Sequence, residues 1–347
     1  MQQVIYSNDI NNTLEGLIAN GDFNRVFVLT DTNTARVALP LLDLDGIIPI
    51  TIPAGEENKN LDTVQAVWQA LIDGGATRQS LLVNLGGGMV TDLGGFAAAT
   101  FKRGIRFVNC PTTLLGAVDA AVGGKTGIDH GGLKNEIGVF AEASHVIVSA
   151  CFFATLPEAE LRSGFAEVLK HAMLSSTDSF KTLLHTNIGN LTPDQWLDLL
   201  RQSIPVKQGI VAQDPTELGL RRVLNLGHTV GHAFESLALQ RGKPVPHGYA
   251  VAWGLVTETV LSRLEAGFDG MLLNDLALMV RDTYGAFNIT CDDYPALLAF
   301  MHRDKKSRNG EINCTLLHSC GTPQPGITIT DDQMTAALDI YRDLMGI

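Results

Sequence analysis

The sequence predicts an α/β domain followed by a mostly α-helical domain. Within residues 1–150, short runs rich in β-branched residues alternate with helical patterns, which is typical of a parallel sheet covered by helices. After residue 151, five helical patterns follow one another before the next strand pattern, at residues 311–317. A chain of 347 residues is long for one hydrophobic core, so we expect two domains, residues 1–150 and 151–347.

The N-terminal elements are predicted from their periodicity and their flanking turns. Residues 34–42 and 60–75 predict helices, and in the second of these the apolar side chains recur on one helical face that ends at two glycines. The predicted strands are residues 25–31, 46–55, 80–88, 106–113 and 145–152. The predicted helices of the second half are residues 157–174, 194–213, 229–239, 248–265 and 273–285.

Composition excludes several classes of protein. The net charge of −12 argues against nucleic acid or an anionic membrane as a partner. The five cysteines contain no CxxC pair, and an odd number of this kind indicates reduced thiols and a cytoplasmic location. The N-terminus lacks the apolar core of a signal peptide, and five glycines interrupt the longest apolar stretch, residues 81–101, so we expect no membrane span.

A glycine-rich turn, "NLGGGMVTDLGG", joins a predicted strand to a predicted helix. Gly86, Gly87 and Gly88 would let the backbone approach a ligand closely, and the helix N-terminus that follows favours a phosphate. The spacing is not the GxGxxG of common dinucleotide sites. The turn therefore fits either a nucleotide site or a tight strand–helix connection.

A basic stretch follows, from Lys102 to Lys134, with five Lys or Arg residues and two Asp in an acidic protein. Two glycine-containing turns each have a lysine alongside, Lys125 and Lys134. Such turns commonly hold a phosphate or a carboxylate. A solvated basic loop is the alternative.

Two further clusters carry chemistry. Glu167 and Lys170 lie three residues apart on a predicted helix, where an exposed ion pair is the ordinary interpretation, although their neighbours are apolar.

His228 and His232 share a helix face, and His247 follows, so three histidines fall within twenty residues. They indicate a metal site or ordinary core histidines. No glutamate lies between the first two, so the HExxH motif of metalloproteases is absent.

Together these motifs strongly resemble the 3-dehydroquinate synthase family of the sugar-phosphate cyclase superfamily. The resemblance extends from about residue 31 to about residue 317. It includes "GGGMVTDLGGFAAATFKRGIRFVNCPTTLLGAVDAAVGGKTGID", "GLKNEIGVF", "TLPEAELRSGFAEVLKHAM", "LNLGHTVGHAFE", "HGYAVAWG" and "DKKSRNGEI". It implies an N-terminal Rossmann-like NAD domain, a mostly helical metal-binding domain, and an active site in the cleft between them.

The reaction that the resemblance implies converts 3-deoxy-D-arabino-heptulosonate 7-phosphate to 3-dehydroquinate and phosphate, in the shikimate pathway of aromatic amino-acid biosynthesis. NAD oxidises the C5 hydroxyl, which acidifies the neighbouring proton, and phosphate is eliminated. The ketone is then reduced back, the ring opens, and an intramolecular aldol step closes the carbocycle. The cofactor is regenerated, so the enzyme is a lyase by outcome. The family's elimination is thought to use the substrate's own phosphate as the base.

The resemblance also implies roles for individual residues. The metal, zinc or cobalt, would be held by Glu167, His228 and His247, and Asp119 would orient the substrate hydroxyls. Several cations and neutral partners would bind the phosphate and carboxylate of the substrate. These are Arg103, supplied by the neighbouring subunit of a homodimer, with Lys125, Asn135, Lys170, Lys207, Arg221, Asn225, His232, Lys305 and Lys306, the last two not distinguished from each other.

NAD contacts are implied at a second set of positions. Among them, the acids Asp31 and Glu56 suit ribose hydroxyls and would repel the 2′-phosphate of NADP. The full set is Asp31, Asn33, Glu56, Lys59, Gly87, Gly88, Asp92, Thr112, Thr113, Lys134, Thr155, Leu156 and Glu160.

Three alternatives remain at this point. Two other kinds of sugar-phosphate cyclase, the valiolone-type cyclases that act on non-carboxylated heptulose phosphates and 2-deoxy-scyllo-inosose synthase, would be expected to lose part of the carboxylate-binding set, which is present here. A metal-dependent alcohol or glycerol dehydrogenase, related in fold, would accumulate NADH. A non-enzymatic NAD-binding protein is the third. Departures from the family pattern are mild, at residues 120–121, Leu226 and Gln208, and none removes a charge or a ligand.

Overall fold

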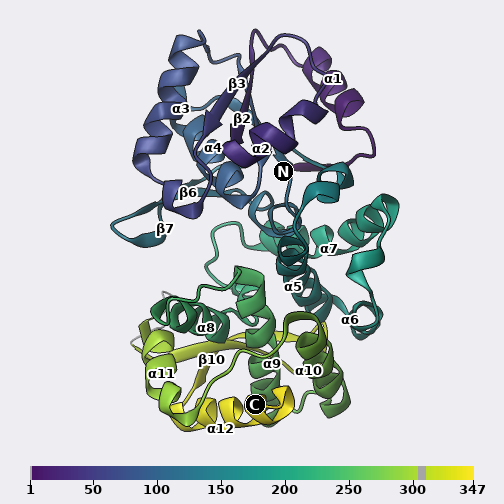
Figure 1. Cartoon of the computed structure of the whole chain (residues 1–347), viewed down its shortest axis with the longest axis vertical. Helices are drawn as coiled ribbons and strands as arrows, with labels where there is room; N and C mark the ends of the chain where they lie inside the picture. The colour runs from purple at the N-terminus through teal and green to yellow at the C-terminus, as the bar shows by residue number, and fades with distance from the viewer. Residues whose placement is uncertain (1, 304–309) are drawn as a thin grey trace. The chain divides into compact units, whose positions relative to one another are not determined.

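The computed structural model describes residues 2–303 and 310–347, which fall into two compact units (Figure 1). The first contains Met1–Pro157 and Asn190–Gln208, and the second contains Glu158–Gly189 and Gly209–Ile347. The predicted fold class, a Rossmann-like α/β domain followed by a mostly helical domain, is confirmed.

A six-stranded parallel sheet organises the first unit, in the order β1-β8-β5-β4-β2-β3. The chain runs from β2 outward to β3 and then returns past β2 to β4, so the strand order reverses between β2 and β4. Ligands of open parallel sheets bind beyond the carboxyl ends of the strands at such a reversal. The strands are β1 Gln3–Tyr6, β2 Val26–Asp31, β3 Ile47–Ile52, β4 Leu81–Gly86, β5 Arg106–Pro111 and β8 His145–Val148.

Both faces of this sheet are covered. Along β2, Phe27 and Leu29 join one hydrophobic core with α3 and α4, whereas Val26 and Val28 join a second core with α1. Burial on both faces explains why the strands were recognisable as continuous apolar runs. The helices that precede residue 157 in this unit are α1 Ile10–Asn20, α2 Thr32–Val37, α3 Leu61–Asp73 and α4 Gly88–Thr100.

The basic glycine-containing stretch folds as an antiparallel hairpin, β6 Lys125–His130 and β7 Leu133–Phe140. Gly131 and Gly132 form its turn with φ of 60° and 80°, a left-handed conformation that favours glycine in two-residue hairpin turns. Gly127 and Gly138 face each other across the hairpin, and a Cβ on Gly127 would lie 2.6 Å from the Ile137 carbonyl oxygen.

The segment Asn190–Gln208 belongs to the first unit, although the chain on either side of it belongs to the second. It contains most of α7 Pro193–Gln213. The Trp196 ring lies edge-on to Phe153 with 5.8 Å between ring centroids, and the Tyr6 hydroxyl donates to the Leu200 carbonyl at 3.5 Å. These contacts make the segment part of the core of the first unit.

Helix α9 is the centre of the second unit and packs against α5, α8, α10 and α12. Neighbouring segments approach α9 closely because it carries glycine where they cross. A Cβ added at Gly248 would lie 1.9 Å from the Ser163 carbonyl oxygen, and one added at Gly254 would lie 2.0 Å from the Gly227 carbonyl oxygen. The elements are α5 Glu158–Ser175, α6 Thr177–Leu184, α8 His228–Gln240, α9 His247–Ala266, α10 Gly270–Tyr284, α11 Tyr294–Arg303, α12 Asp331–Met345, and the antiparallel pair β9 Ile312–Leu317 and β10 Pro323–Ile329.

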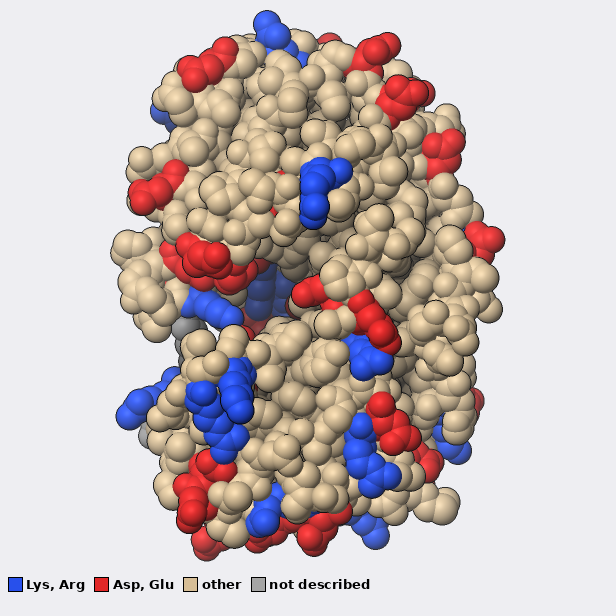
Figure 2. All heavy atoms as spheres, in the orientation of Figure 1, with Lys and Arg blue, Asp and Glu red and all other residues tan. Residues whose placement is uncertain are grey.

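The surface carries both signs of charge. On the face drawn in Figure 2, acidic and basic side chains are interspersed among uncharged ones, so the net charge of −12 is not gathered there into one acidic patch. Of the helices in residues 2–303 and 310–347, none combines the length and hydropathy that a membrane span requires.

Candidate metal centre

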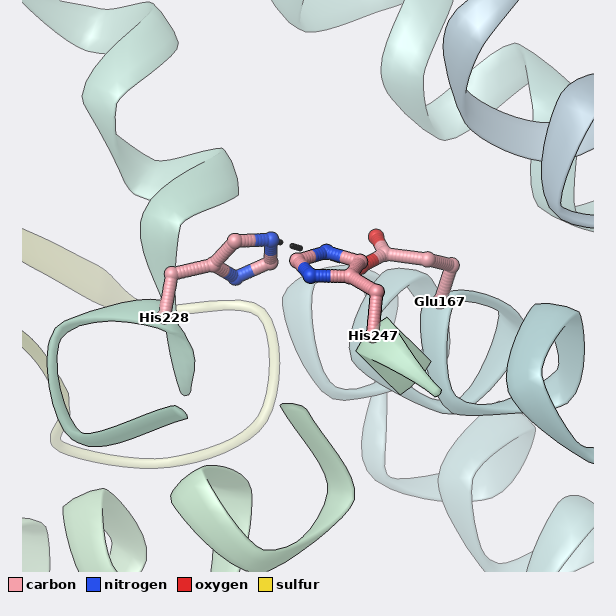
Figure 3. A group of neighbouring side chains, drawn as sticks. All are labelled: Glu167, His228 and His247. Carbon is pink, nitrogen blue, oxygen red and sulfur yellow. Dashed lines mark ion pairs between the residues drawn. The ribbon is translucent and has the colours of Figure 1, made fainter. Parts of the chain in front are cut away.

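Three side chains from three helices of the second unit converge on one point (Figure 3). Glu167 comes from the middle of α5, His228 is the first residue of α8, and His247 is the first residue of α9. One ligand atom from each lies within 4.8 Å of the other two. Glu167 is completely buried, and His228 is nearly so. A carboxylate with two imidazoles is a ligand set of catalytic zinc sites, which leave a coordination position open.

Hydrogen bonding fixes which nitrogen His228 presents to this point. Its Nδ1 lies 3.1 Å from the Leu226 carbonyl oxygen, which can only accept, so Nδ1 carries the proton. The lone pair is then on Nε2, which lies 3.3 Å from Oε1 of Glu167. A lone pair and a carboxylate oxygen repel at this separation unless a proton or a metal ion lies between them. The donor set therefore fits a cation.

Glu167 is ionised in this environment. Burial alone would raise its pKa, but the buried Lys170 ammonium lowers the pKa well below its usual range. Lys170 forms an ion pair with the carboxylate, and both side chains are buried, so the exposed ion pair is excluded as the interpretation of this motif. Lys170 contacts Oε2 of Glu167, and no hydrogen bond from the described residues satisfies Oε1, which leaves Oε1 able to coordinate a metal.

His232 does not belong to the three-residue group. Its ring centroid lies 5.6 Å from that of His228 and 5.9 Å from that of His247. The helical spacing of His228 and His232 does place both rings on one side of α8. The structure nevertheless groups His228 with His247 and Glu167, as the resemblance implied, and leaves His232 beside them.

The other substrate-binding residues predicted in the second unit lie near the start of α8. Arg221 is buried and donates to the Pro215 carbonyl at 2.7 Å, and Asn225 ends the same short 3₁₀ segment, Leu220–Asn225, shortly before His228. Lys305 and Lys306 lie outside the described residues.

In the first unit, buried Lys59 contacts two other predicted NAD residues, Asp92 and Glu56, and one predicted substrate residue, Asn135. Lys59 Nζ lies 2.7 Å from Asp92 Oδ2, 2.7 Å from Asn135 Oδ1 and 3.4 Å from Glu56 Oε1. Burial alone would lower the pKa of Lys59, but the carboxylates of Asp92 and Glu56 outweigh it and raise the pKa. Burial raises the pKa of Asp92 to about 6, and Lys59 offsets this in part.

Several of the predicted nucleotide residues lie at the carboxyl ends of the parallel strands, and the others lie on neighbouring segments or on α5. Asp31 ends β2 and caps α2, accepting from the backbone amides of Asn33 and Thr34 at 2.8 Å each. Gly87 and Gly88 follow β4, where the strand order reverses. A Cβ added at Gly87 would lie 3.1 Å from the Thr113 side chain, and one added at Gly88 would lie 3.2 Å from Ala120, so glycine keeps this edge of the sheet open.

The remaining predicted nucleotide residues lie on other segments. Thr112 and Thr113 follow β5, and Lys134 lies on β7. Thr155 is the last residue of the 3₁₀ segment Ala150–Thr155, and Leu156 is its C-cap. Glu160 is exposed in the first turn of α5.

The remaining predicted substrate residues of the first unit are Asp119, Lys125, Lys207 and Arg103. Buried Lys207 donates to the Asp119 backbone oxygen at 2.6 Å and pairs with its carboxylate. Lys125 is exposed at the start of β6. Arg103 is exposed after α4 and has a φ of 67°, directly after Lys102 at 51°, two strained left-handed residues in succession.

Two acids that the sequence analysis did not single out lie beside the histidine ligands. Glu235 contacts the His247 ring, and Glu258 contacts the backbone at the start of α8. The sequence held a signal for Glu258, because it is the only charge in the otherwise uncharged stretch 248–262 of a buried helix. Glu235 carried no comparable signal.

Comparisons with known proteins agree with this architecture. Residues 49–163 match the family described as 3-dehydroquinate synthase N-terminal, and residues 164–307 match 3-dehydroquinate synthase C-terminal. A 3-dehydroquinate synthase of Parabacteroides distasonis is 42% identical over 100% of this chain and 99% of its own length. That of Pyrococcus furiosus is 40% identical over 86% of this chain and 88% of its own length.

Solved structures confirm the fold at lower sequence identity. A 2-deoxy-scyllo-inosose synthase complexed with carbaglucose-6-phosphate, NAD⁺ and Co²⁺ matches with a TM-score of 0.86 at 20% identity, over 98% of this chain and 96% of that one. A 2-epi-5-epi-valiolone synthase from Streptomyces hygroscopicus with NAD⁺ and Zn²⁺ bound matches with a TM-score of 0.83 at 24% identity. The match covers 99% of this chain and 97% of that one. With its identity to curated relatives over its full length, the chain belongs to the 3-dehydroquinate synthase family.

Proposed function

We propose that this protein is an NAD- and metal-dependent lyase that converts 3-deoxy-D-arabino-heptulosonate 7-phosphate to 3-dehydroquinate and phosphate, in aromatic amino-acid biosynthesis. The observation that carries the proposal is the convergence of Glu167, His228 and His247 within 4.8 Å in a chain of this family. Residues 1–150 would bind NAD, and residues 151–347 would bind the metal and the substrate.

The donor set favours zinc or cobalt over magnesium, since two of its three atoms are imidazole nitrogens. When bound, the metal would stabilise an alkoxide at the substrate hydroxyls, and NAD would accept and return the hydride. The ionised Glu167 and the Nδ1–H tautomer of His228 are ready to coordinate without a prior proton transfer.

Anion binding is assigned to the basic side chains of both units. The substrate carries a phosphate and a carboxylate, and cationic side chains bind such groups, most strongly where burial keeps water from screening them. The residues proposed for this role are Arg103, Lys125, Lys170, Lys207 and Arg221, with Asn135, Asn225 and His232 as neutral or switchable partners, Asp119 as an orienting group, and Lys305 or Lys306 completing the set.

The nucleotide site is proposed at the reversal of strand order in the first unit. Asp31 at the end of β2 would bind ribose hydroxyls, and the open edge at Gly87 and Gly88 would receive the pyrophosphate. The acids Asp31 and Glu56 favour NAD over NADP. The remaining proposed contacts are Asn33, Lys59, Asp92, Thr112, Thr113, Lys134, Thr155, Leu156 and Glu160.

We further propose a cytoplasmic homodimer. Exposed Arg103, which like Lys102 has a left-handed backbone conformation, would reach the active site of the neighbouring subunit. The five cysteines are all free, which fits a reducing compartment.

A cyclase acting on a non-carboxylated heptulose phosphate is the second candidate, because a solved 2-epi-5-epi-valiolone synthase shares the fold, as does a 2-deoxy-scyllo-inosose synthase. The curated 3-dehydroquinate synthases are closer in sequence, at 38–42% identity compared with 20–24% for those cyclases. An alcohol dehydrogenase-like activity has weaker support, since an iron-containing alcohol dehydrogenase matches with a TM-score of 0.61 at 15% identity.

A phosphate-release assay tests the proposal. Purified protein with NAD and Zn²⁺ or Co²⁺ should release phosphate from the heptulosonate phosphate with no net NADH, and a chelator should abolish release. Release only from a carboxylate-free heptulose phosphate would select the second candidate. Stoichiometric NADH would instead indicate a dehydrogenase.

A further inference from the structure

Helices α8 and α9 each carry one histidine ligand and one buried or half-buried acid that contacts the other helix. Helix α8 carries His228 and Glu235, and helix α9 carries His247 and Glu258. Glu235 Oε2 lies 3.2 Å from Nδ1 of His247. Glu258 accepts from the backbone amides on either side of His228, in Gly227 and Val230.

We propose that Glu235 and Glu258 are positioning residues of the metal centre, with the acid of each helix fixing the histidine of the other. The inference rests on the proposed metal site but not on the identity of the substrate. Neither acid is among the three residues that could coordinate the ion.

Glu235 would act on His247 directly. A carboxylate can only accept, so Nδ1 of His247 carries the proton and its lone pair is on Nε2. A carboxylate behind a metal-bound imidazole orients the ring and raises the basicity of the coordinating nitrogen. His228 has a backbone carbonyl in the same place, that of Leu226. The two imidazoles are thus fixed in the same tautomer by different acceptors.

Glu258 would act on His228 through the backbone. Its side chain is completely buried, and its two oxygens lie 2.8 Å from the Gly227 nitrogen and 3.1 Å from the Val230 nitrogen. Helix α8 has no side-chain cap from its own N-terminal residues, so this carboxylate from α9 satisfies amides that would otherwise be buried without acceptors.

Because Glu258 lies on α9, its hydrogen bonds do more than cap α8: they also link the two helices. A local serine or aspartate would satisfy the same amides without linking the two helices. The acid instead extends from the helix that begins with His247, and α9 also contacts the Gly227 carbonyl through Gly254. The positions of the two histidine backbones are therefore tied to each other through one hydrogen-bonded crossing.

The test measures metal binding as well as turnover. Metal-free wild type, Glu235→Gln, Glu258→Gln and the control Glu265→Gln, an exposed acid on the same helix α9, are titrated with Co²⁺ and followed by visible absorption. Thermal unfolding of the metal-free proteins is measured alongside. Substitutions behind a metal ligand typically weaken metal binding about 10–100-fold. We expect losses of this size in Glu235→Gln and Glu258→Gln, an altered Co²⁺ spectrum, wild-type behaviour in the control, and phosphate release restored at saturating Co²⁺.

The outcomes separate the alternatives. Co²⁺ affinity and spectrum equal to wild type in Glu235→Gln would overturn the role of Glu235. A lowered unfolding temperature with unchanged Co²⁺ affinity in Glu258→Gln would make Glu258 a structural cap and overturn its role. If Glu258→Gln does not fold, Glu258→Asp keeps the charge with a shorter reach and should still change the Co²⁺ spectrum; an unchanged spectrum would overturn the role. Wild type that fails to bind Co²⁺ would instead refute the proposed function.

Discussion

Replacing Gly248 with alanine should separate two helices that both carry proposed metal ligands. The added Cβ would lie 1.9 Å from the Ser163 carbonyl oxygen, where ordinary contact begins at 3.4 Å. Helices α5 and α9 must therefore move apart by about 1.5 Å, because the contacted atom is backbone and cannot turn away. Ser163 lies one helical turn before Glu167, and Gly248 directly follows His247.

This displacement is large compared with what a metal site tolerates. Ligand distances hold within about 0.2 Å, so a shift of about 1.5 Å detaches either His247 or Glu167 unless the site rearranges. We expect Co²⁺ binding at least tenfold weaker, a loss of about 1.4 kcal/mol. Overpacking itself should lower the free energy of unfolding by about 1–3 kcal/mol.

The assay is Co²⁺ titration of the metal-free protein by visible absorption, with urea unfolding in parallel. Gly209→Ala is the matched control, since Gly209 is also helical and nothing lies within 4 Å of its added Cβ. This control should bind Co²⁺ as wild type does and gain up to about 1 kcal/mol from helix propensity. Equal Co²⁺ affinity and spectrum in Gly248→Ala and Gly209→Ala would refute the argument from helix separation.

Three further substitutions test the two units. Glu167→Gln should lose Co²⁺ binding and phosphate release together, because a neutral amide is a poor ligand; retained metal affinity would contradict its role. His232→Ala should keep Co²⁺ affinity but raise KM for the substrate, and an emptied metal site would show the ligand assignment to be wrong. Lys59→Met should cost about 3–5 kcal/mol in urea unfolding, since it removes one partner of a buried ion pair. The double variant Lys59→Met with Asp92→Asn should recover part of that loss, whereas a loss equal to the sum of the two single variants would argue against coupling.

The sequence predicted the elements whose signals are local. The strands β2, β4 and β5 are buried on both faces, so their apolar runs stand out, and α3 has a clear amphipathic period. The strand β1, of four residues, is too short to give such a signal. The hairpin β6–β7 was interpreted as two turns because its glycines, needed for close backbone approach, interrupt any strand pattern.

The metal ligands could not be paired from spacing. Helical spacing favoured His228 with His232, but which histidine meets His228 depends on how α9 crosses α8, and no local pattern encodes that crossing. Glu167 lies on a third helix, and only the resemblance to a family pointed to it. The same holds for Lys59, which meets Asp92 and Asn135 from distant parts of the chain.

The path of the chain also constrains how the protein is made. The core of the first unit is complete only when Asn190–Gln208 has been added, with Trp196 against Phe153. A ribosome must therefore synthesise residues 158–189, which belong to the second unit, before the first unit can close its core. A nascent chain ending at residue 157 would lack the buried side chains of Leu197 and Leu200. The first unit is thus the first to begin synthesis, yet it cannot finish folding as the N-terminal domain of a multidomain chain ordinarily does.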